Sequence, residues 1–165
     1  MESMEARMVK LYARNNNHVA LHAIPGHFAT SHSHINFYID MTSLKTRANE
    51  AQEVAKSLAG DYVNSTVVDT IVCMDGTEVV GAYLAQEFEK RGFRNTNLHD
   101  TIYVVTPEYN ANNQLIFRDN TIPAIKGKNV ILLLATTTTG LTVRRSLECV
   151  QYYGGTVRGI SSIFS

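Results

Sequence analysis

Four consecutive threonines followed by a glycine form the segment with the clearest capacity for chemistry. The apolar run 130–135 leads into them, and a helix-like pattern over about 142–153 follows. Hydroxyl groups and free backbone N–H groups at the start of a helix, together with the helix dipole, bind phosphate-sized anions. The candidate phosphate-binding residues are Thr136, Thr137, Thr138, Thr139, Gly140, Leu141 and Thr142. The alternative is that the threonines only finish the strand and cap the helix.

A group of histidines close together in the sequence forms a second candidate site. Its members are His22, His27, His32 and His34. Neutral imidazole nitrogens are good ligands for zinc or nickel. However, His32 and His34 alternate along a strand-like stretch, and neither cysteine lies near them in the sequence. We therefore expect surface histidines and no metal site.

Strand-like and helix-like segments alternate along the chain. Apolar or alternating stretches predict strands, and apolar residues spaced three and four apart predict helices. The expected strands cover about 19–23, 34–40, 67–73, 102–105, 130–134 and 156–164. The expected helices cover about 1–14, 44–58, 79–88 and 142–153, with a β-hairpin or loop at 106–128. This order predicts an α/β fold with a mostly parallel central sheet flanked by helices.

The length and composition favour a single folded domain over residues 1–165. Hydrophobic residues make up 44% of the chain and charged residues 18%, as in globular proteins. Fifteen basic and fifteen acidic side chains give no net charge, so we expect neither nucleic acid nor a membrane as a partner. Two cysteines and an N-terminus unlike a signal peptide predict a cytoplasmic protein.

Three segments of the sequence resemble the type I phosphoribosyltransferases, and most of all the orotate phosphoribosyltransferases. The strand, threonines, glycine and helix around 132–142 look like the phosphoribosyl-pyrophosphate loop of that family. Residues 26–40 are similar to its opening segment, and residues 68–84 are similar to a third segment. The resemblance covers roughly residues 20–163 in the family's order. It implies a small N-terminal hood over about 1–40 and an α/β core over about 41–165.

The resemblance also implies a ligand, a cofactor and a partner. The ligand would be phosphoribosyl pyrophosphate or a nucleotide, the cofactor Mg²⁺ if the protein is active, and the partner a second copy in a homodimer. In the family, two adjacent acids before the threonine loop hold the ribose hydroxyls, and here these degenerate ribose-binding positions are Leu134 and Ala135. Because a hydrogen bond to a charged group contributes about 1.5–3 kcal/mol, losing two lowers ribose affinity by roughly 10²- to 10⁴-fold.

The lid is a second departure from the family's pattern. Orotate-specific members place an Arg- and Lys-rich loop with a His over the pyrophosphate, whereas residues 106–114 contain no Lys, Arg or His. Such cations stabilise the negative charge that develops on the departing pyrophosphate. Arg118, Lys126 and Lys128 do not match the motif, and we expect them to be solvated surface charges.

The loop on the pyrophosphate side is a third departure. Its residues are Met74, Asp75, Gly76 and Thr77, where the family usually has more glycine. Asp75 and the following Glu78 would repel pyrophosphate unless a divalent cation lies between them.

Two functions remain open from the sequence. The first is a divergent orotate phosphoribosyltransferase-like enzyme of nucleotide metabolism and pyrimidine biosynthesis, which transfers phosphoribosyl to a base and releases pyrophosphate. No catalytic residue can be assigned for it. The second is a catalytically inactive ligand sensor or partner subunit that keeps only a phosphate pocket.

Overall fold

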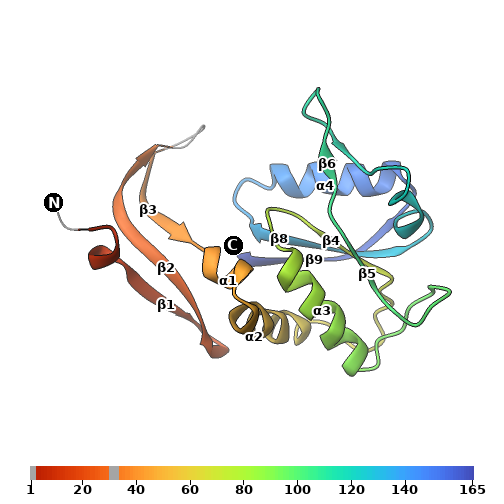
Figure 1. Ribbon diagram of the computed structural model, residues 1–165, viewed down its shortest axis with the longest axis horizontal. Coiled ribbons are helices and arrows are strands. Elements are labelled where there is room, and N and C mark those ends of the chain that lie inside the picture. Colours follow the sequence, from red (N-terminus) through yellow and green to blue (C-terminus); the bar gives the residue numbers. More distant parts are fainter. Residues whose placement is uncertain (1–2, 30–33) are drawn as a thin grey trace.

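The computed structural model describes residues 3–29 and 34–165, which form an N-terminal sheet, a central sheet and a small hairpin (Figure 1). In chain order the elements are η1 (Glu5–Arg7), β1 (Val9–Ala13), β2 (Asn16–Ala29), β3 (His34–Asp40), α1 (Thr42–Thr46), α2 (Ala48–Ala59), β4 (Thr70–Cys73), α3 (Glu78–Lys90), β5 (Tyr103–Val105), β6 (Glu108–Tyr109), β7 (Leu115–Ile116), η2 (Ile122–Ala124), β8 (Asn129–Thr136), α4 (Leu141–Tyr152) and β9 (Thr156–Phe164).

The central sheet is parallel, with its strands in the order β5, β4, β8, β9. β8 pairs with β4 on one side and with β9 on the other, and residues 130–135 are all buried. A strand covered on both faces needs a continuous apolar run rather than an alternating one. The predicted α/β fold with a mostly parallel sheet flanked by helices is therefore confirmed.

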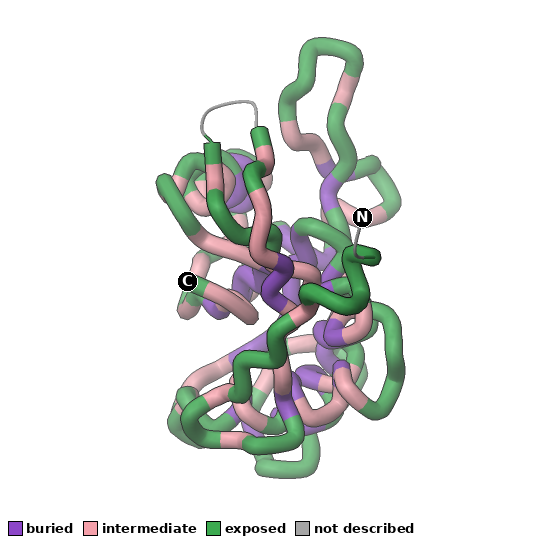
Figure 2. Tube along the Cα trace, turned by 90° about the vertical axis from the view of Figure 1, so that its left-hand side faces the viewer, coloured by how far each residue is buried: buried purple, intermediate pink, exposed green. Residues whose placement is uncertain are grey.

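Helices cover both faces of this sheet. Ile131 and Leu133 of β8 pack against the side that carries α2 and α3. Val130, Leu132 and Leu134 pack against the opposite side, which carries α4 and β7. Figure 2 shows the buried positions gathered in the middle of the molecule and the β6–β7 hairpin standing out as a mostly exposed arm. The core is thus two apolar layers on either side of one sheet.

The N-terminal sheet, called the hood sheet below, consists of β1, β2 and β3 in antiparallel order. Val19 and Leu21 of β2 pack into the same apolar layer as α2. The register shifts between Tyr12 and Ala13, and again between Pro25 and Phe28. The hood sheet is therefore joined to the α/β core through β2 and α2.

The prediction of a helix over 1–14 is wrong for residues 3–14, which the structure describes. Only Glu5–Arg7 form a short 3₁₀ turn, and Val9–Ala13 form β1, which pairs with β2. An isolated helix of this length is marginal in water. The long-range pairing with β2 therefore overrides the local helical pattern.

The helix expected over 44–58 is divided into α1 and α2. Arg47 between them has φ −87° and ψ 121°, which is extended backbone. The buried stripe of α2 consists of Ala51, Val54, Ala55 and Ala59. The break allows α1 to take its own direction, toward the loop that follows β4.

The remaining expected elements are present near their predicted bounds, except that β2 extends beyond 19–23 at both ends. The segment 106–128 contains a hairpin, in which Glu108 of β6 lies opposite Ile116 of β7. None of the helices in residues 3–29 and 34–165 is long and apolar enough to cross a membrane.

Of the candidate histidines, His27 and His34 lie at the far end of the hood sheet, whereas His22 lies within β2, opposite Lys10 and Asp40. His27 Nε2 and His34 Nδ1 are 2.9 Å apart, and their rings are stacked. His32, together with Thr30 and Ser31 of the opening segment, lies outside the described residues. Within the described ranges, no three His, Cys, Asp or Glu side chains gather in a group that could hold a metal ion.

Candidate functional site

Two loops meet at the carboxyl edge of the central sheet, between neighbouring strands β4 and β8. The chain leaves β4 through α3 to reach β5 on one side, and it leaves β8 through α4 to reach β9 on the other. The two connections therefore diverge, which opens a crevice outside the ends of β4 and β8. In parallel α/β sheets, ligands bind at such a switch point.

The threonine loop forms the main wall of this crevice. Gly140 precedes α4 with φ 78° and ψ 2°, a left-handed conformation that glycine adopts at little cost. The Thr137 N–H donates to Phe164 O at 3.0 Å, and the Thr137 and Ser162 hydroxyls are 3.3 Å apart. These bonds fix the start of the loop to β9, while Thr138 and Thr139 remain exposed.

The backbone N–H groups that follow are free. Among the described residues, the N–H groups of residues 138–143 have no acceptor, and no threonine hydroxyl caps the first turn of α4. The structure therefore does not support the alternative in which the threonines serve as helix caps. Free N–H groups at a helix N-terminus carry a partial positive charge that attracts anions.

The seven candidate phosphate-binding residues lie together around one small cavity of about 140 Å³. Its lining residues are Asp75, Thr136, Thr137, Thr138, Thr139, Gly140, Leu141, Thr142 and Val143. We call this cavity the threonine pocket. Asp75 is the residue that the loop after β4 contributes, so the two loops meet here as the topology requires.

The loop 74–77 has a strained and tightly tied backbone. Asp75 and Gly76 both have positive φ, at 57° and 76°. The buried Thr77 hydroxyl donates to Met74 O at 2.7 Å and Leu133 O at 3.2 Å, which ties the loop to β8. An aspartate in the left-handed region costs about 1–3 kcal/mol, and such strain gathers at functional sites.

Lys45 was not found by sequence reasoning. Its Nζ donates to the Asp75 carbonyl at 2.9 Å, so a half-buried cation lies beside the threonine pocket. No local pattern marks it, because Lys45 lies on α1, far from the loop in sequence. Asp40 lies near it, and hydrogen bonds from Thr42 hold the pKa of the Asp40 carboxyl below its usual value.

The two degenerate ribose positions are buried. Leu134 is fully covered in the layer beneath α4, and Ala135 is only 3% exposed. Neither offers a polar atom from its side chain to the threonine pocket. The only carboxylate among the pocket's lining residues is Asp75.

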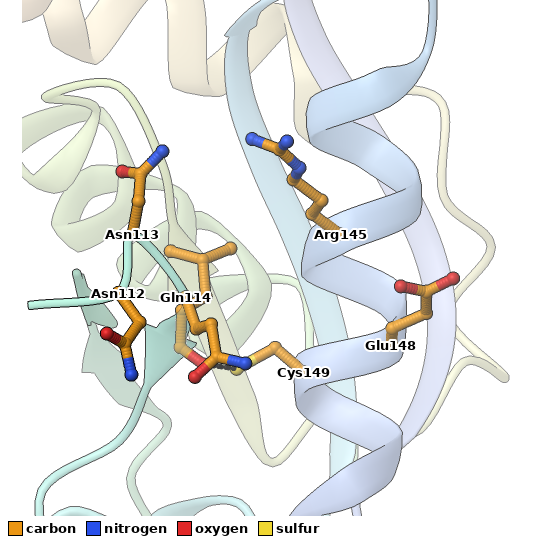
Figure 3. A pocket seen from close by; sticks show the side chains of 7 residues that line it. Asn112, Asn113, Gln114, Arg145, Glu148 and Cys149 are labelled. Atoms are coloured by element: carbon orange, nitrogen blue, oxygen red, sulfur yellow. Dashed lines mark hydrogen bonds between the residues drawn. The ribbon is translucent and has the colours of Figure 1, made fainter. Parts of the chain in front are cut away.

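The hairpin does not cover the threonine pocket. Cys149 Sγ lies 3.4 Å from Leu115 O, and Phe117 packs edge-on against Tyr153, so the hairpin is held against the C-terminal half of α4. Between them lies a cavity of about 440 Å³, lined by Asn112, Asn113, Gln114, Leu115, Arg145, Glu148 and Cys149. In Figure 3, Arg145 projects from α4 toward the side on which Asn113 lies.

The charged groups near the hairpin lie at the surface. Arg118 is exposed and its Nε donates to Glu108 at 2.8 Å, while Lys126 is exposed and Lys128 half-buried. Burial raises the pKa of the Cys149 thiol to about 11 and that of Cys73 to about 12, so neither is a ready nucleophile.

A buried carboxylate at the opposite end of the sheet has a structural role. Asp69 Oδ2 accepts hydrogen bonds from the backbone and side chain of Asn129, both at 2.7 Å, and Oδ1 accepts from the backbone and hydroxyl of Thr96. Burial alone would raise the pKa of Asp69, but these bonds hold it below its ordinary value. Asp69 thus ties the amino ends of β4 and β8 together, away from the threonine pocket.

No protein-family model matches the sequence, and no curated protein matches it. Solved structures do match. Orotate phosphoribosyltransferase from Mycobacterium tuberculosis H37Rv superposes with a TM-score of 0.54 and 16% identity, over 86% of this chain and 76% of that chain. UMP synthase from Leishmania donovani has a TM-score of 0.60 and 18% identity, over 85% of this chain and 28% of that chain.

Adenine phosphoribosyltransferase from Leishmania donovani also matches, with a TM-score of 0.57 and 17% identity, over 86% of this chain and 63% of that chain. The chain therefore has the fold of the type I phosphoribosyltransferases, as the resemblance predicts.

Proposed function

We propose that the threonine pocket binds the terminal phosphate of a phosphoribosyl compound or nucleotide. The observation that carries this proposal is the run of free N–H groups over residues 138–143, which line a hydroxyl-rich cavity beside the left-handed Gly140. A hydrogen bond to a charged group contributes about 1.5–3 kcal/mol, so two or three of these N–H groups are enough for specific phosphate binding. The similar M. tuberculosis enzyme was solved with phosphoribosyl pyrophosphate and with inorganic phosphate, which supports this ligand class.

We propose further that the chain acts as a binding protein of nucleotide metabolism rather than as an efficient transferase. Leu134 and Ala135 give the ribose no acceptor, and both are buried in packed layers. The segment 106–114 contains no cation, and the β6–β7 hairpin lies against α4. Both features remove groups that phosphoribosyl transfer would use to hold the sugar and to stabilise departing pyrophosphate.

Phosphoribosyl transfer to a base such as orotate is the second candidate, and Asp75 favours it. Mg²⁺ binds through one or two carboxylates together with phosphate oxygens of the substrate. The residues present fit such an ion in part, because Asp75 lines the threonine pocket and the remaining ligands would come from the substrate. If bound, Mg²⁺ would neutralise charge on the pyrophosphate, while Lys45 holds the loop carrying Asp75.

We also propose a cytoplasmic homodimer. Cys73 and Cys149 are free thiols, which fits a reducing compartment. Two surfaces offer contacts to a second copy. One is the hood sheet face that carries Val9, Leu11 and Phe37, which are 47%, 46% and 54% exposed. The other is the side of edge strand β9 that carries Ile160, which is 43% exposed.

Calorimetric titration with phosphoribosyl pyrophosphate tests the function, with and without Mg²⁺ and with inorganic phosphate as the reference. We expect the affinity for phosphoribosyl pyrophosphate to exceed that for phosphate by no more than about tenfold. We also expect Mg²⁺ not to change the affinity for phosphoribosyl pyrophosphate. Tight Mg²⁺-dependent binding, with pyrophosphate released in the presence of orotate, would instead establish transfer.

A pair of exposed threonines supplies the matched control. Thr139→Glu puts a carboxylate at the threonine pocket, whereas Thr101→Glu makes the same change at an exposed turn before β5. Only the first variant should lose phosphate binding. Loss in both, or in neither, would overturn the assignment of the pocket.

A further inference from the structure

The cavity between the β6–β7 hairpin and α4, called the hairpin cavity below, has the size and lining of a small-molecule site. It has a volume of about 440 Å³ and shares no lining residue with the threonine pocket. Pockets of roughly 300–1,000 Å³ that combine apolar surface with a few polar groups are typical of ligand sites. Here the half-buried Leu115 and the buried Cys149 supply the apolar floor, and the polar groups are three amides, a guanidinium and a carboxylate.

Asn110 holds the hairpin wall of this cavity in one conformation. Its Oδ1 accepts the backbone N–H groups of Asn112 and Gln114, each at 2.9 Å, and its carbonyl accepts the Asn113 N–H at 2.9 Å. Asn113 has φ 58°, in the left-handed region that asparagine tolerates better than most residues. The turn is therefore formed before a ligand binds, which lowers the entropy cost of binding.

The same hydrogen bonds determine which end of the Gln114 amide is left for a ligand. Because Asn110 Oδ1 already accepts two N–H groups, Asn110 Nδ2 is the donor to Gln114 Oε1, at 3.0 Å. The Gln114 Nε2 group has no acceptor in the part of the chain that the structure describes, and in Figure 3 it points toward α4. The hairpin therefore presents a hydrogen-bond donor to the cavity.

On the opposite wall, α4 supplies a cation that is not neutralised. Arg144 Nε donates to Glu148 Oε1 at 3.0 Å, so the one carboxylate of the cavity is paired with a guanidinium outside it. Arg145 forms no ion pair with any residue in 3–29 or 34–165. In Figure 3 Arg145 extends toward the side of Asn113, whereas the Glu148 carboxylate is turned away from it. The cavity thus combines positive charge and N–H donors with an apolar floor.

We propose that the hairpin cavity binds a small organic carboxylate, in which the carboxylate group is carried on an apolar or aromatic body. The planar guanidinium of Arg145 matches the two oxygens of a carboxylate, and the amides of Asn113 and Gln114 supply further N–H donors. The apolar body would cover Leu115 and Cys149. Inorganic phosphate would leave that apolar surface exposed to water, which makes it the poorer ligand here.

This site is separate from the proposed phosphate site. The two cavities lie on different parts of α4, with residues 141–143 at one and Arg145, Glu148 and Cys149 at the other. A carboxylate in the hairpin cavity would contact the hairpin and α4 together, so it would hold the hairpin against α4. The proposal therefore does not depend on what the threonine pocket binds.

Titration with benzoate, followed by NMR of the side-chain N–H groups, tests this site. Benzoate carries a carboxylate on a flat apolar ring, benzamide has the same shape without the charge, and inorganic phosphate has the charge without the ring. We expect benzoate to shift the amide signals of Asn113 and Gln114 with a dissociation constant on the order of 1 mM. Benzamide should bind at least about tenfold more weakly, and phosphate should leave these signals unchanged. Equal shifts with phosphate would overturn the choice of an organic carboxylate.

Three variants locate the binding residues. Arg145→Gln removes the charge and should weaken benzoate binding at least about tenfold. Arg94→Gln is its matched control, because Arg94 is also exposed and forms no ion pair within the described residues, and it should leave the affinity unchanged. Asn113→Gly removes the amide but keeps the positive φ, which glycine adopts freely, and should weaken binding about 2- to 10-fold.

Circular dichroism of the three variants establishes that they fold. Equal benzoate affinity in the parent and in Arg145→Gln, or no saturable shift of the Asn113 and Gln114 amides, would overturn the proposal. Neither result bears on phosphate binding at the threonine pocket, which calorimetry decides separately.

Discussion

Replacing Gly140 with alanine tests whether the backbone conformation of the threonine loop makes the phosphate site. Gly140 has φ 78°, and a Cβ built there meets no atom within 4 Å. Alanine therefore clashes with nothing and changes only the conformational preference. The left-handed region costs an L-residue about 1–2 kcal/mol.

The size of the expected effect follows from how the loop is held. Thr138, Thr139 and Leu141 are exposed, so packing does not force the substituted loop to stay left-handed. We expect it to relax, which depletes the binding-competent conformation and weakens phosphate affinity about 5- to 30-fold, the factor that corresponds to 1–2 kcal/mol. Isothermal titration with inorganic phosphate measures this change directly.

Gly92→Ala is the matched control for this variant. Gly92 has φ 76°, a Cβ there also meets nothing within 4 Å, and the residue follows the end of α3 that points away from loop 74–77. It should lower the free energy of unfolding by about 1–2 kcal/mol without changing phosphate affinity. Equal phosphate affinity for the parent and both variants would refute the reasoning about the threonine loop.

Three further predictions concern buried groups. Leu134→Asp restores an acid at a ribose position, and it should lower the free energy of unfolding by about 3 kcal/mol or more, because the charge is buried without a partner. The control Leu134→Met should lower it by less than about 1.5 kcal/mol. Urea unfolding measures both values. Cys73 and Cys149 should resist thiol reagents at pH 8 until the chain unfolds. Because their pKa values are raised to about 12 and 11, stability should fall as pH rises above 9.0, where the unfolded thiols lose their protons. Asp69→Asn should cost about 1–3 kcal/mol for each N–H left without an acceptor. Since the pKa of Asp69 is lowered, the parent's stability should fall as pH drops below 3.8, and this loss should be smaller in the variant.

The central sheet could be predicted from the sequence because each of its strands carries its own signal. The apolar run 130–135 needs burial on both faces, and only a central strand of a covered sheet provides that. The segment 1–14 behaved differently. Its local pattern is compatible with a helix. The segment forms β1 instead because it pairs with residues 16–23 of β2, and this pairing cannot be detected from the residues of the segment alone.

The two loops of the candidate site were predictable, the threonine loop from its residues and loop 74–77 from the family resemblance, whereas Lys45 was not. In the threonine loop, a strand, four threonines, a glycine and a helix follow one another directly in the sequence. Their order alone therefore predicts a phosphate site. Lys45 reaches Asp75 across thirty positions, through the break at Arg47 that separates α1 from α2. The apolar spacing over 44–58 continues across that break, so the sequence predicts one helix there.

The meeting of two loops at the switch point has a consequence for the lifetime of the protein. Asp75 and Gly140 belong to segments that come together only when β4 and β8 pair. A ligand that binds there binds the folded chain and not the unfolded one, and at about a hundred times its dissociation constant it adds about 2.7 kcal/mol to stability. Degradation of the chain would then slow as the concentration of its ligand rises. The cellular amount of the protein would therefore rise with ligand concentration even if the protein catalyses no reaction.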